Sequence, residues 1–260
     1  MRVKAILIGL ALLLAVTPAL AQDSSTHTVA FDGFRFNFDE ALAAHVNITQ
    51  YAGDPASIGP GFAEPPYTQF ALYNQFPVPE SLLETVGSVR VYRLADLAGY
   101  DEDLRQVEQL RTLLAERPDL TPHMVARDSA SENALPFLPV FPAGQIVRAR
   151  AHYLDAPAVS GISFVTVYSQ AVEPLLADEF LWTFQGLSGN GEYYVMALFP
   201  LHVGLFPQEV GPDYDPDALI TRLVEYLNES IATLNSAAPS DFSPSLDRLD
   251  ALVSTFAFGE

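Results

Sequence analysis

Residues 180–199 carry the strongest structural signal in the sequence, because two alternating segments flank a short glycine-rich stretch. Aromatic residues recur at every second position before the glycines, and apolar residues do so after them, which is the period of a β-strand. These positions are Phe180, Trp182, Phe184, Tyr193, Val195, Ala197 and Phe199. Residues 188–191, Ser-Gly-Asn-Gly, tolerate positive φ and suit a tight turn. The pattern predicts a β-hairpin.

The glycines of this hairpin do not indicate a phosphate-binding loop. Such loops direct backbone N–H groups and a helix N-terminus at the anion, usually with a lysine. Here a strand follows the glycines, and the only lysine is Lys4. A valine at Gly189 or Gly191 is expected to destabilise the protein by about 1 to 3 kcal/mol wherever the glycine has positive φ.

Four further segments show strand-like alternation, and we expect each to bury one face. The first, 27–38, contains a turn at Asp32-Gly33, and the second is 87–97. The other two, 145–151 and 162–168, are separated by a turn-like segment. Together with the hairpin they predict an antiparallel sheet.

Helical periodicity occurs at three places, and each has a start signal. Asp101 can cap a helix that ends before Pro118, with Leu104, Val107, Leu110 and Leu114 on one face. Asp215-Pro216 opens a second helix through about residue 235, and Ser243-Pro244 opens a third. The last residues, 254–258, can rejoin the sheet. Helices between and after antiparallel strands indicate an α+β fold with about three α-helices.

Three proline- and glycine-rich stretches separate the periodic segments: 52–66, 131–144 and 200–217. Proline prevents regular helix or central strand there. Each stretch also contains apolar residues, which favours straps packed over a core rather than polar linkers. We therefore expect residues 22–260 to form a single α+β domain.

Residues 1–21 have the pattern of a secretory signal peptide. Arg2 and Lys4 precede an apolar run, 5–16, and the small-residue pattern at Ala19 and Ala21 predicts cleavage after Ala21. The run is shorter than the roughly 20 residues that span a bilayer, and no later segment has that many consecutive apolar residues. We expect a soluble extracytoplasmic protein, periplasmic or associated with the cell surface, with no transmembrane segment in the mature chain. It contains no cysteine.

The charge balance argues against anionic partners. The chain has 13 Lys and Arg against 32 Asp and Glu, a formal net charge of −19. Removing Arg2 and Lys4 with the signal peptide gives −19 − 2 = −21. Nucleic-acid binding takes its affinity from Lys and Arg on phosphates, so it is excluded, and anionic lipid surfaces are disfavoured. The acidity suits cations or basic partners, although it also simply favours solubility.

Metal and cofactor signals are weak. No two of the five histidines have the spacing of a shared metal site. Asp213, Asp215 and Asp217 have the spacing that opens a calcium loop, but Ala218 replaces the required glycine and Val224 the closing glutamate. We interpret Asp215 as a helix cap and expect no metal and no cofactor.

Catalytic patterns are also sparse. No Gly-x-Ser-x-Gly elbow and no cysteine nucleophile occur, and we interpret His152 as a structural residue. Glu173, Asp178 and Glu179 could form a carboxylate pair across a cleft, as glycoside hydrolysis requires, but only the fold can set their separation. An extracellular hydrolase that uses paired carboxylates therefore stays the alternative hypothesis.

A binding surface is the remaining candidate. In the segment LPFLPVFP, Phe137 and Phe141 lie on a proline-stiffened loop and could form a pre-organised apolar contact site. The competing interpretation is a strap that seals the core. An apolar ligand or a protein partner would suit such a site.

Two resemblances accompany these observations. The segments 138–154, 180–200 and 241–258 resemble a group of secreted bacterial proteins for which no activity is assigned. The amino-terminal hairpin, the antiparallel middle and a final helix leading into STFAF are similar to the PsbP-like fold of photosystem accessory proteins. This second resemblance implies a role in binding or assembly and carries no functional residue over. We expect a secreted, non-catalytic binding protein or an envelope-associated assembly or accessory protein.

Overall fold

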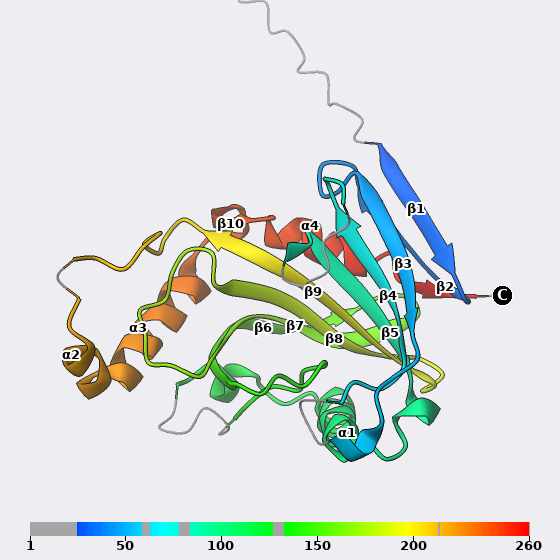
Figure 1. Ribbon diagram of the computed structural model, residues 1–260, viewed down its shortest axis with the longest axis horizontal. Helices are drawn as coiled ribbons and strands as arrows, with labels where there is room; N and C mark the ends of the chain where they lie inside the picture. The colour runs from blue at the N-terminus through cyan, green and yellow to red at the C-terminus, as the bar shows by residue number, and fades with distance from the viewer. Residues whose placement is uncertain (1–24, 59–62, 78–83, 127–132, 213, 260) are drawn as a thin grey trace, which may run out of the picture.

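The computed structural model describes residues 25–58, 63–77, 84–126, 133–212 and 214–259. The predicted signal peptide, 1–21, lies outside the described residues. The fold is of the mixed α+β class, as the sequence predicts, and the described residues form an eight-stranded antiparallel sheet, a three-stranded sheet and four α-helices (Figure 1).

The large sheet has the strand order β3-β4-β5-β9-β8-β7-β6, and a short strand, β10 (Phe242–Ser243), also pairs with β9. Its main strands are β3 (His45–Tyr51), β4 (Tyr67–Tyr73), β5 (Gly87–Arg93), β6 (Gly144–Asp155), β7 (Val159–Ser169), β8 (Phe180–Ser188) and β9 (Tyr193–Val203). The predicted hairpin is β8 with β9, in which Trp182 pairs with Phe199. The stretch 200–203 belongs to β9, so the third proline-rich stretch begins inside a strand.

The small sheet contains both ends of the described chain. β1 (Thr26–Phe31) and β2 (Phe34–Asp39) form the amino-terminal hairpin, and β11 (Ala257–Phe258) pairs with β2. The prediction that the STFAF segment rejoins a sheet is therefore confirmed, although it joins the small sheet. Phe34 lies 5.3 Å from Phe256 between ring centroids, which ties the two ends together.

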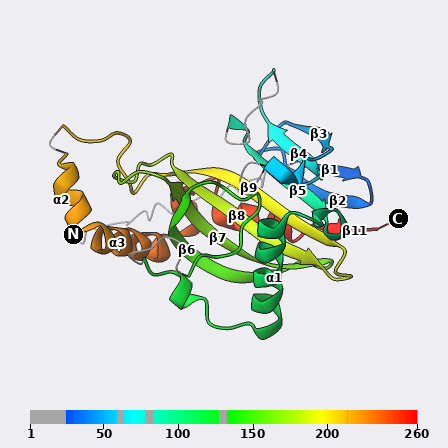
Figure 2. The ribbon, with the colours of Figure 1, turned by 60° about the horizontal axis from the view of Figure 1, so that its bottom comes forward.

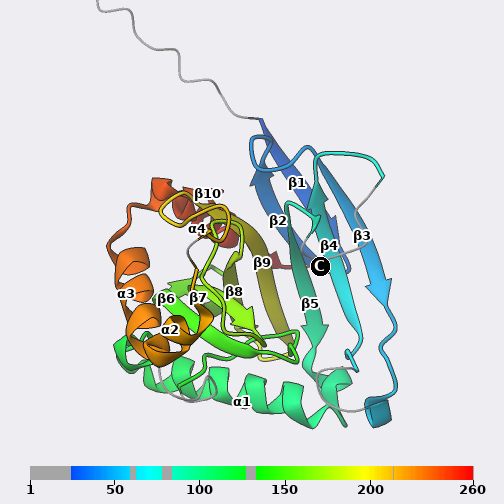
Figure 3. The same ribbon diagram turned by 60° about the vertical axis from the view of Figure 1, so that its left-hand side comes forward.

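Both faces of the large sheet are covered by helices. α1 (Asp101–Glu116) covers one face, where Val107, Leu110 and Leu113 pack in a core with Tyr92 and Tyr194. α3 (Leu223–Ser236) and α4 (Leu246–Val253) lie on the other side (Figures 2 and 3). Because both faces are covered, the hairpin strands are buried on both faces, whereas a sheet with one open face would alternate buried and exposed.

The predicted start of the first helix needs a correction. Asp101 is not a cap: it lies inside α1, and the capping position is Tyr100, without a side-chain hydrogen bond. The buried face of α1 includes Val107 and Leu110, as predicted, together with Asp103 and Leu113, while Leu104 and Leu114 are partly buried and pack against the same core.

The second predicted helix is divided at Arg222 into α2 (Pro216–Thr221) and α3. Arg222 has φ −117°, outside the helical range, so the hydrogen-bond ladder is interrupted there. Asp215 caps α2 as predicted, because its carboxylate accepts hydrogen bonds from the N–H groups of Asp217 and Ala218 at 3.0 and 3.3 Å.

None of the helices in the described part of the chain is long and apolar enough to cross a membrane.

The turn of the β8–β9 hairpin gives a stability prediction with an internal control. Gly191 has φ +71°, which β-branched residues resist, whereas Gly189 is outside the positive-φ region. Gly191→Val is expected to lower the free energy of unfolding by about 1 to 3 kcal/mol in urea denaturation. Gly189→Val is the control and should have little effect. Equal losses in the two variants would contradict the turn geometry.

Candidate functional site

A strap formed by residues 133–141 lies against the large sheet and is held by three glutamine side chains. Gln145 Oε1 accepts from the Leu135 N–H at 2.8 Å, and Gln185 Oε1 accepts from the Leu138 N–H at 3.0 Å. Gln106 of α1 accepts from the Phe137 N–H at 3.1 Å. A proline-rich segment cannot join a ladder of strands, so side-chain amides satisfy its backbone instead.

The strap carries both predicted binding residues, but they lie in different environments. Phe137 is only 3% exposed and belongs to the core under α1, whereas Phe141 is half-buried. Their ring centroids are 5.4 Å apart, and Tyr168 of β7 lies 4.9 Å from Phe137 and 5.1 Å from Phe141. Burial raises the pKa of the Tyr168 hydroxyl, so this group stays neutral. Phe137 therefore fixes the aromatic cluster to the core, and Phe141 is its partly exposed member.

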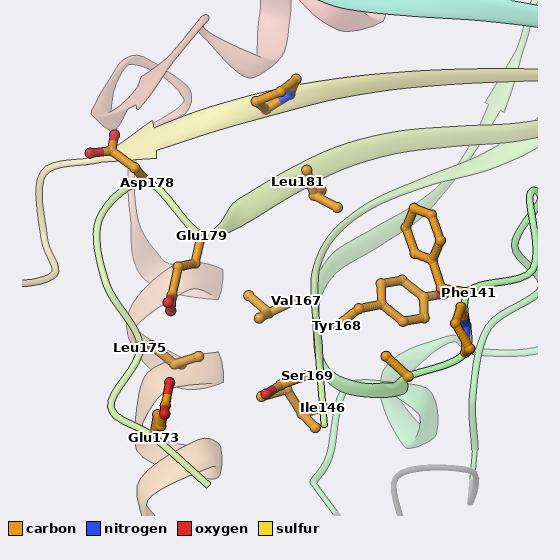
Figure 4. Close-up of a pocket in the computed structure, with 13 residues that line it drawn as sticks. Phe141, Ile146, Val167, Tyr168, Ser169, Glu173, Leu175, Asp178, Glu179 and Leu181 are labelled. Atoms are coloured by element: carbon orange, nitrogen blue, oxygen red, sulfur yellow. The ribbon is translucent and has the colours of Figure 1, made fainter. Parts of the chain in front are cut away.

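Phe141 and Tyr168 line a pocket of about 380 Å³ at the end of the sheet where β7 ends and β8 begins (Figure 4). We call it the β7–β8 pocket. Its other apolar walls come from the two residues between the strap and β6, from β6, β7, β8 and β9, and from the segment between β7 and β8. They are Pro142, Ala143, Ile146, Val167, Leu175, Leu181 and Pro200.

The three carboxylates singled out in the sequence line the same pocket. Glu173, Asp178 and Glu179 all lie in the segment between β7 and β8 and are exposed. Figure 4 shows the carboxylates of Glu173 and Glu179 beside Leu175, while Asp178 points away from the aromatic residues. The fold therefore brings Phe141 together with these acidic residues, which are at least 32 positions further along the chain.

Two of these carboxylates have local partners. Asp178 lies 2.7 Å from His202 Nδ1, and Glu179 Oε2 accepts a hydrogen bond from the Leu176 N–H at 2.9 Å. Glu173 makes no hydrogen bond or ion pair with any residue that the structure describes. The pocket therefore combines apolar walls with an acidic rim. One carboxylate of that rim, Glu173, has no hydrogen-bond or ion-pair partner among the described residues.

The calcium candidate receives no support from the geometry. Asp215 uses its carboxylate to cap α2, and Asp213 lies outside the described residues. Within the described ranges, no group of three His, Asp or Glu side chains could hold a metal ion.

His152 lies close to a serine and a carboxylate, but not in the arrangement of a catalytic triad. Its Nε2 atom is 3.1 Å from Ser163 Oγ and 3.2 Å from Asp250 Oδ2. A triad uses the two ring nitrogens for the two partners, and its serine must reach the substrate. Here Nδ1 faces the Arg150 carbonyl, and Ser163 is fully buried. The contact with Asp250 raises the pKa of His152 and also links β6 to α4.

Sequence reasoning missed a buried polar cluster around β5. Arg90 is nearly buried, and its guanidinium contacts Glu64 at 3.1 Å and Gln69 at 2.8 Å. It also lies 4.1 Å above the ring of Tyr67. The alternation in segment 87–97 predicts only one buried face, whereas Arg90 on the other face is buried as well. No local pattern reveals Glu64 as its partner, because Glu64 lies in a proline-rich stretch.

Asp103, near the start of α1, gives a pH-dependent prediction. Burial, with the nearby charges of Glu102 and Glu64, raises its pKa from 3.8 to about 6, although a hydrogen bond to its own backbone opposes the shift. The native state therefore binds the proton more tightly than the unfolded state, and ionisation costs stability as pH rises from about 4 to 6. Asp103→Asn, which cannot ionise, should be more stable than wild type by about 1 to 3 kcal/mol at pH 7.

The measurement is urea unfolding at pH 4 and pH 7, with the exposed Asp101→Asn variant as the control. The advantage of Asp103→Asn should shrink toward pH 4, where the wild-type carboxyl is protonated in the native state and begins to be protonated in the unfolded state as well. An advantage that grows toward pH 4 would show that the sign of the shift is wrong.

In comparisons with known proteins, no family model matches the chain, and no curated protein matches it significantly. The chemistry of the β7–β8 pocket therefore carries the functional argument.

Proposed function

We propose that the protein is an exported, non-catalytic binding protein that acts through the β7–β8 pocket, as a carrier or as an accessory to assemblies of the cell envelope. The observation that carries the proposal is the pocket itself, about 380 Å³ with mainly apolar walls. Ligand sites are typically concave, predominantly apolar and furnished with a few polar groups at defined places.

The strap supports this proposal because it makes one wall of the pocket rigid. Phe141 packs against Phe137, which is buried in the core, and against Tyr168 of the sheet, and these two rings also contact each other. A side chain fixed in this way loses little conformational entropy when a ligand binds.

The test is binding of 1-octanol, a neutral apolar probe, measured by isothermal titration calorimetry. We expect wild type to bind with a dissociation constant of about 1 mM or below. Ala143→Phe places a ring in the pocket and should weaken binding at least about tenfold. Ala98→Phe, at an exposed position outside the pocket, is the control. No binding by wild type, or equal binding by Ala143→Phe, would contradict the proposal.

The second candidate is an extracellular hydrolase, because Glu173 and Glu179 both line the pocket. Glycosidases use two carboxyl groups about 5 to 5.5 Å apart for retention, or roughly 6.5 to 9.5 Å apart for inversion. The binding proposal is favoured because Glu179 is engaged by the Leu176 N–H. We expect no release of nitrophenol from nitrophenyl glycosides. Turnover by wild type that is lost in both Glu173→Gln and Glu179→Gln would establish the hydrolase.

Export is part of the proposal, and it rests on the amino-terminal sequence pattern. Signal peptidase recognises small residues such as Ala19 and Ala21 before the cleavage site. Amino-terminal sequencing of the protein recovered outside the cytoplasm should begin at Gln22. Recovery of a chain that begins at Met1 would contradict cleavage.

We also propose that the architecture is PsbP-like. Support comes from the hairpin β1–β2, the antiparallel sheet and the passage from α4 into β11. The test is superposition of an experimental structure on PsbP-like domains: the same strand order is expected, and a different connection of β5 to β9 would contradict the proposal.

A further inference from the structure

We infer that the ligand of the β7–β8 pocket is a small hydrophobic cation, an ammonium group attached to an apolar body. This inference rests on the proposed binding function and adds the chemical class of the ligand to it.

The apolar part of the ligand follows from the walls and the size of the pocket. Ile146, Val167, Leu175 and Leu181 provide aliphatic surface, and the volume is about 380 Å³. A water molecule takes about 30 Å³ of liquid, so the pocket has room for roughly a dozen groups of that size. A straight chain of eight carbons with one polar headgroup is within this limit.

The positive charge of the ligand follows from the rim. The charged side chains that line the pocket are all acidic, and among the described residues no arginine or histidine lines it. His202 contacts Asp178, which points away from the aromatic residues, so it does not neutralise Glu173 or Glu179 (Figure 4). The Leu176 N–H donates only to Oε2 of Glu179, so Oε1 of this carboxylate can accept a hydrogen bond from a ligand.

The aromatic wall also favours a cation. Phe141 and Tyr168 stand edge to face at 86°, and Phe141 is half-buried at the pocket. A cation within about 6 Å of such a ring centroid is attracted by the negative face of the ring. An ammonium group placed between this wall and the acidic rim would be stabilised from both sides.

An anionic ligand of the same shape is disfavoured by the same groups. A fatty acid would bring its carboxylate to Glu173 and Glu179, and like charges that close repel. The net charge of −19 adds repulsion at longer range. The pocket therefore selects by charge as well as by apolar fit.

The experiment compares three probes that share one chain of eight carbons: n-octylammonium, 1-octanol and octanoate. Calorimetric titration of wild type at pH 7 and low salt, below the aggregation concentration of each probe, should give the tightest binding for n-octylammonium. We expect it to bind at least about tenfold more tightly than octanoate, with 1-octanol between them. Added salt should reduce this preference, since screening weakens interactions of exposed charges.

Two double variants with the same net charge locate the effect. Glu173→Gln with Glu179→Gln removes the rim charges, whereas Glu40→Gln with Glu116→Gln removes two exposed charges that do not line the pocket. The rim variant should lose the preference for n-octylammonium and still bind 1-octanol like wild type. The control variant should keep the preference. Binding of 1-octanol also shows that each variant is folded. If the double rim variant does not fold, the single variant Glu173→Gln takes its place.

The outcomes separate the inference from the function on which it rests. If wild type binds none of the probes, the proposed binding function fails. If 1-octanol binds but octanoate binds as tightly as n-octylammonium, the pocket stands and the inference of a cationic ligand is overturned. A preference that persists in the rim variant, or that disappears equally in the control variant, also overturns it.

Discussion

Replacing Gln185 with leucine is expected to lower the free energy of unfolding by about 3 to 5 kcal/mol. Gln185 is fully buried, and its Oε1 accepts from the Leu138 N–H and from the Tyr194 hydroxyl. Leucine fills a similar space but leaves both donors without an acceptor, and each such loss costs about 1 to 3 kcal/mol. Urea unfolding followed by the fluorescence of Trp182, the single buried tryptophan, measures the loss.

A double-mutant cycle with Tyr194→Phe tests the cause of this loss. Phenylalanine has no hydroxyl, so one of the two donors no longer needs Gln185. The double variant should therefore be destabilised by less than the sum of the two single losses. Gln208→Leu, at an exposed position, is the control and should change stability by about 0.5 kcal/mol or less. Strict additivity would show that the hydrogen bond from Tyr194 is not energetically important.

Gly161→Ala is the second substitution with a large expected effect, about 2 to 4 kcal/mol. Gly161 in β7 pairs directly with Gly186 in β8, and the ring of Phe184 lies against both glycines. A Cβ atom on Gly161 would overlap the Gln185 carbonyl and this ring, so backbone as well as side chain must move. Overpacking of this kind costs about 1 to 3 kcal/mol and sometimes more.

The control for this prediction is Gly211→Ala, because a Cβ atom at Gly211 meets nothing within 4 Å and its φ is not positive. Its stability should equal that of wild type within about 0.5 kcal/mol. If Gly161→Ala were as stable as this control in thermal denaturation, the close approach of Phe184 would be wrong.

The elements with strong periodicity could be predicted from the sequence. The hairpin of β8 and β9, the cap at Asp215 and the return of the last strand to a sheet follow from local rules. Alternation and capping depend on neighbours within a few residues, so one sequence contains the needed information.

Other elements could not be predicted, because tertiary contacts decide them. β3 and β4 lack clear alternation: β3 is an edge strand with exposed polar residues, and a proline-rich stretch separates the two. In β6, Arg150 has φ +55° at a break in the pairing register. Its guanidinium reaches the Ala237 carbonyl at 2.6 Å near the end of α3, a contact 87 residues away in sequence.

The site could be predicted only in pieces. Phe141 was identified from its loop, and Glu173 and Glu179 from their charge, but nothing in the sequence indicates that they line one pocket. Phe137 has the same local pattern as Phe141, yet it is buried in the core. The difference arises because Gln106 and Gln185, on separate elements, fix how the strap lies on the sheet.

The most direct test of the binding function is an NMR titration of protein with labelled Ile, Leu and Val methyl groups. On addition of 1-octanol, the methyl signals of Ile146, Val167, Leu175 and Leu181 should shift in proportion to occupancy. Methyl signals of Val89 and Leu249, which are buried in the core and do not line the pocket, should not move. Shifts confined to other regions, or no shifts at millimolar probe, would contradict the assignment of this pocket as the binding site.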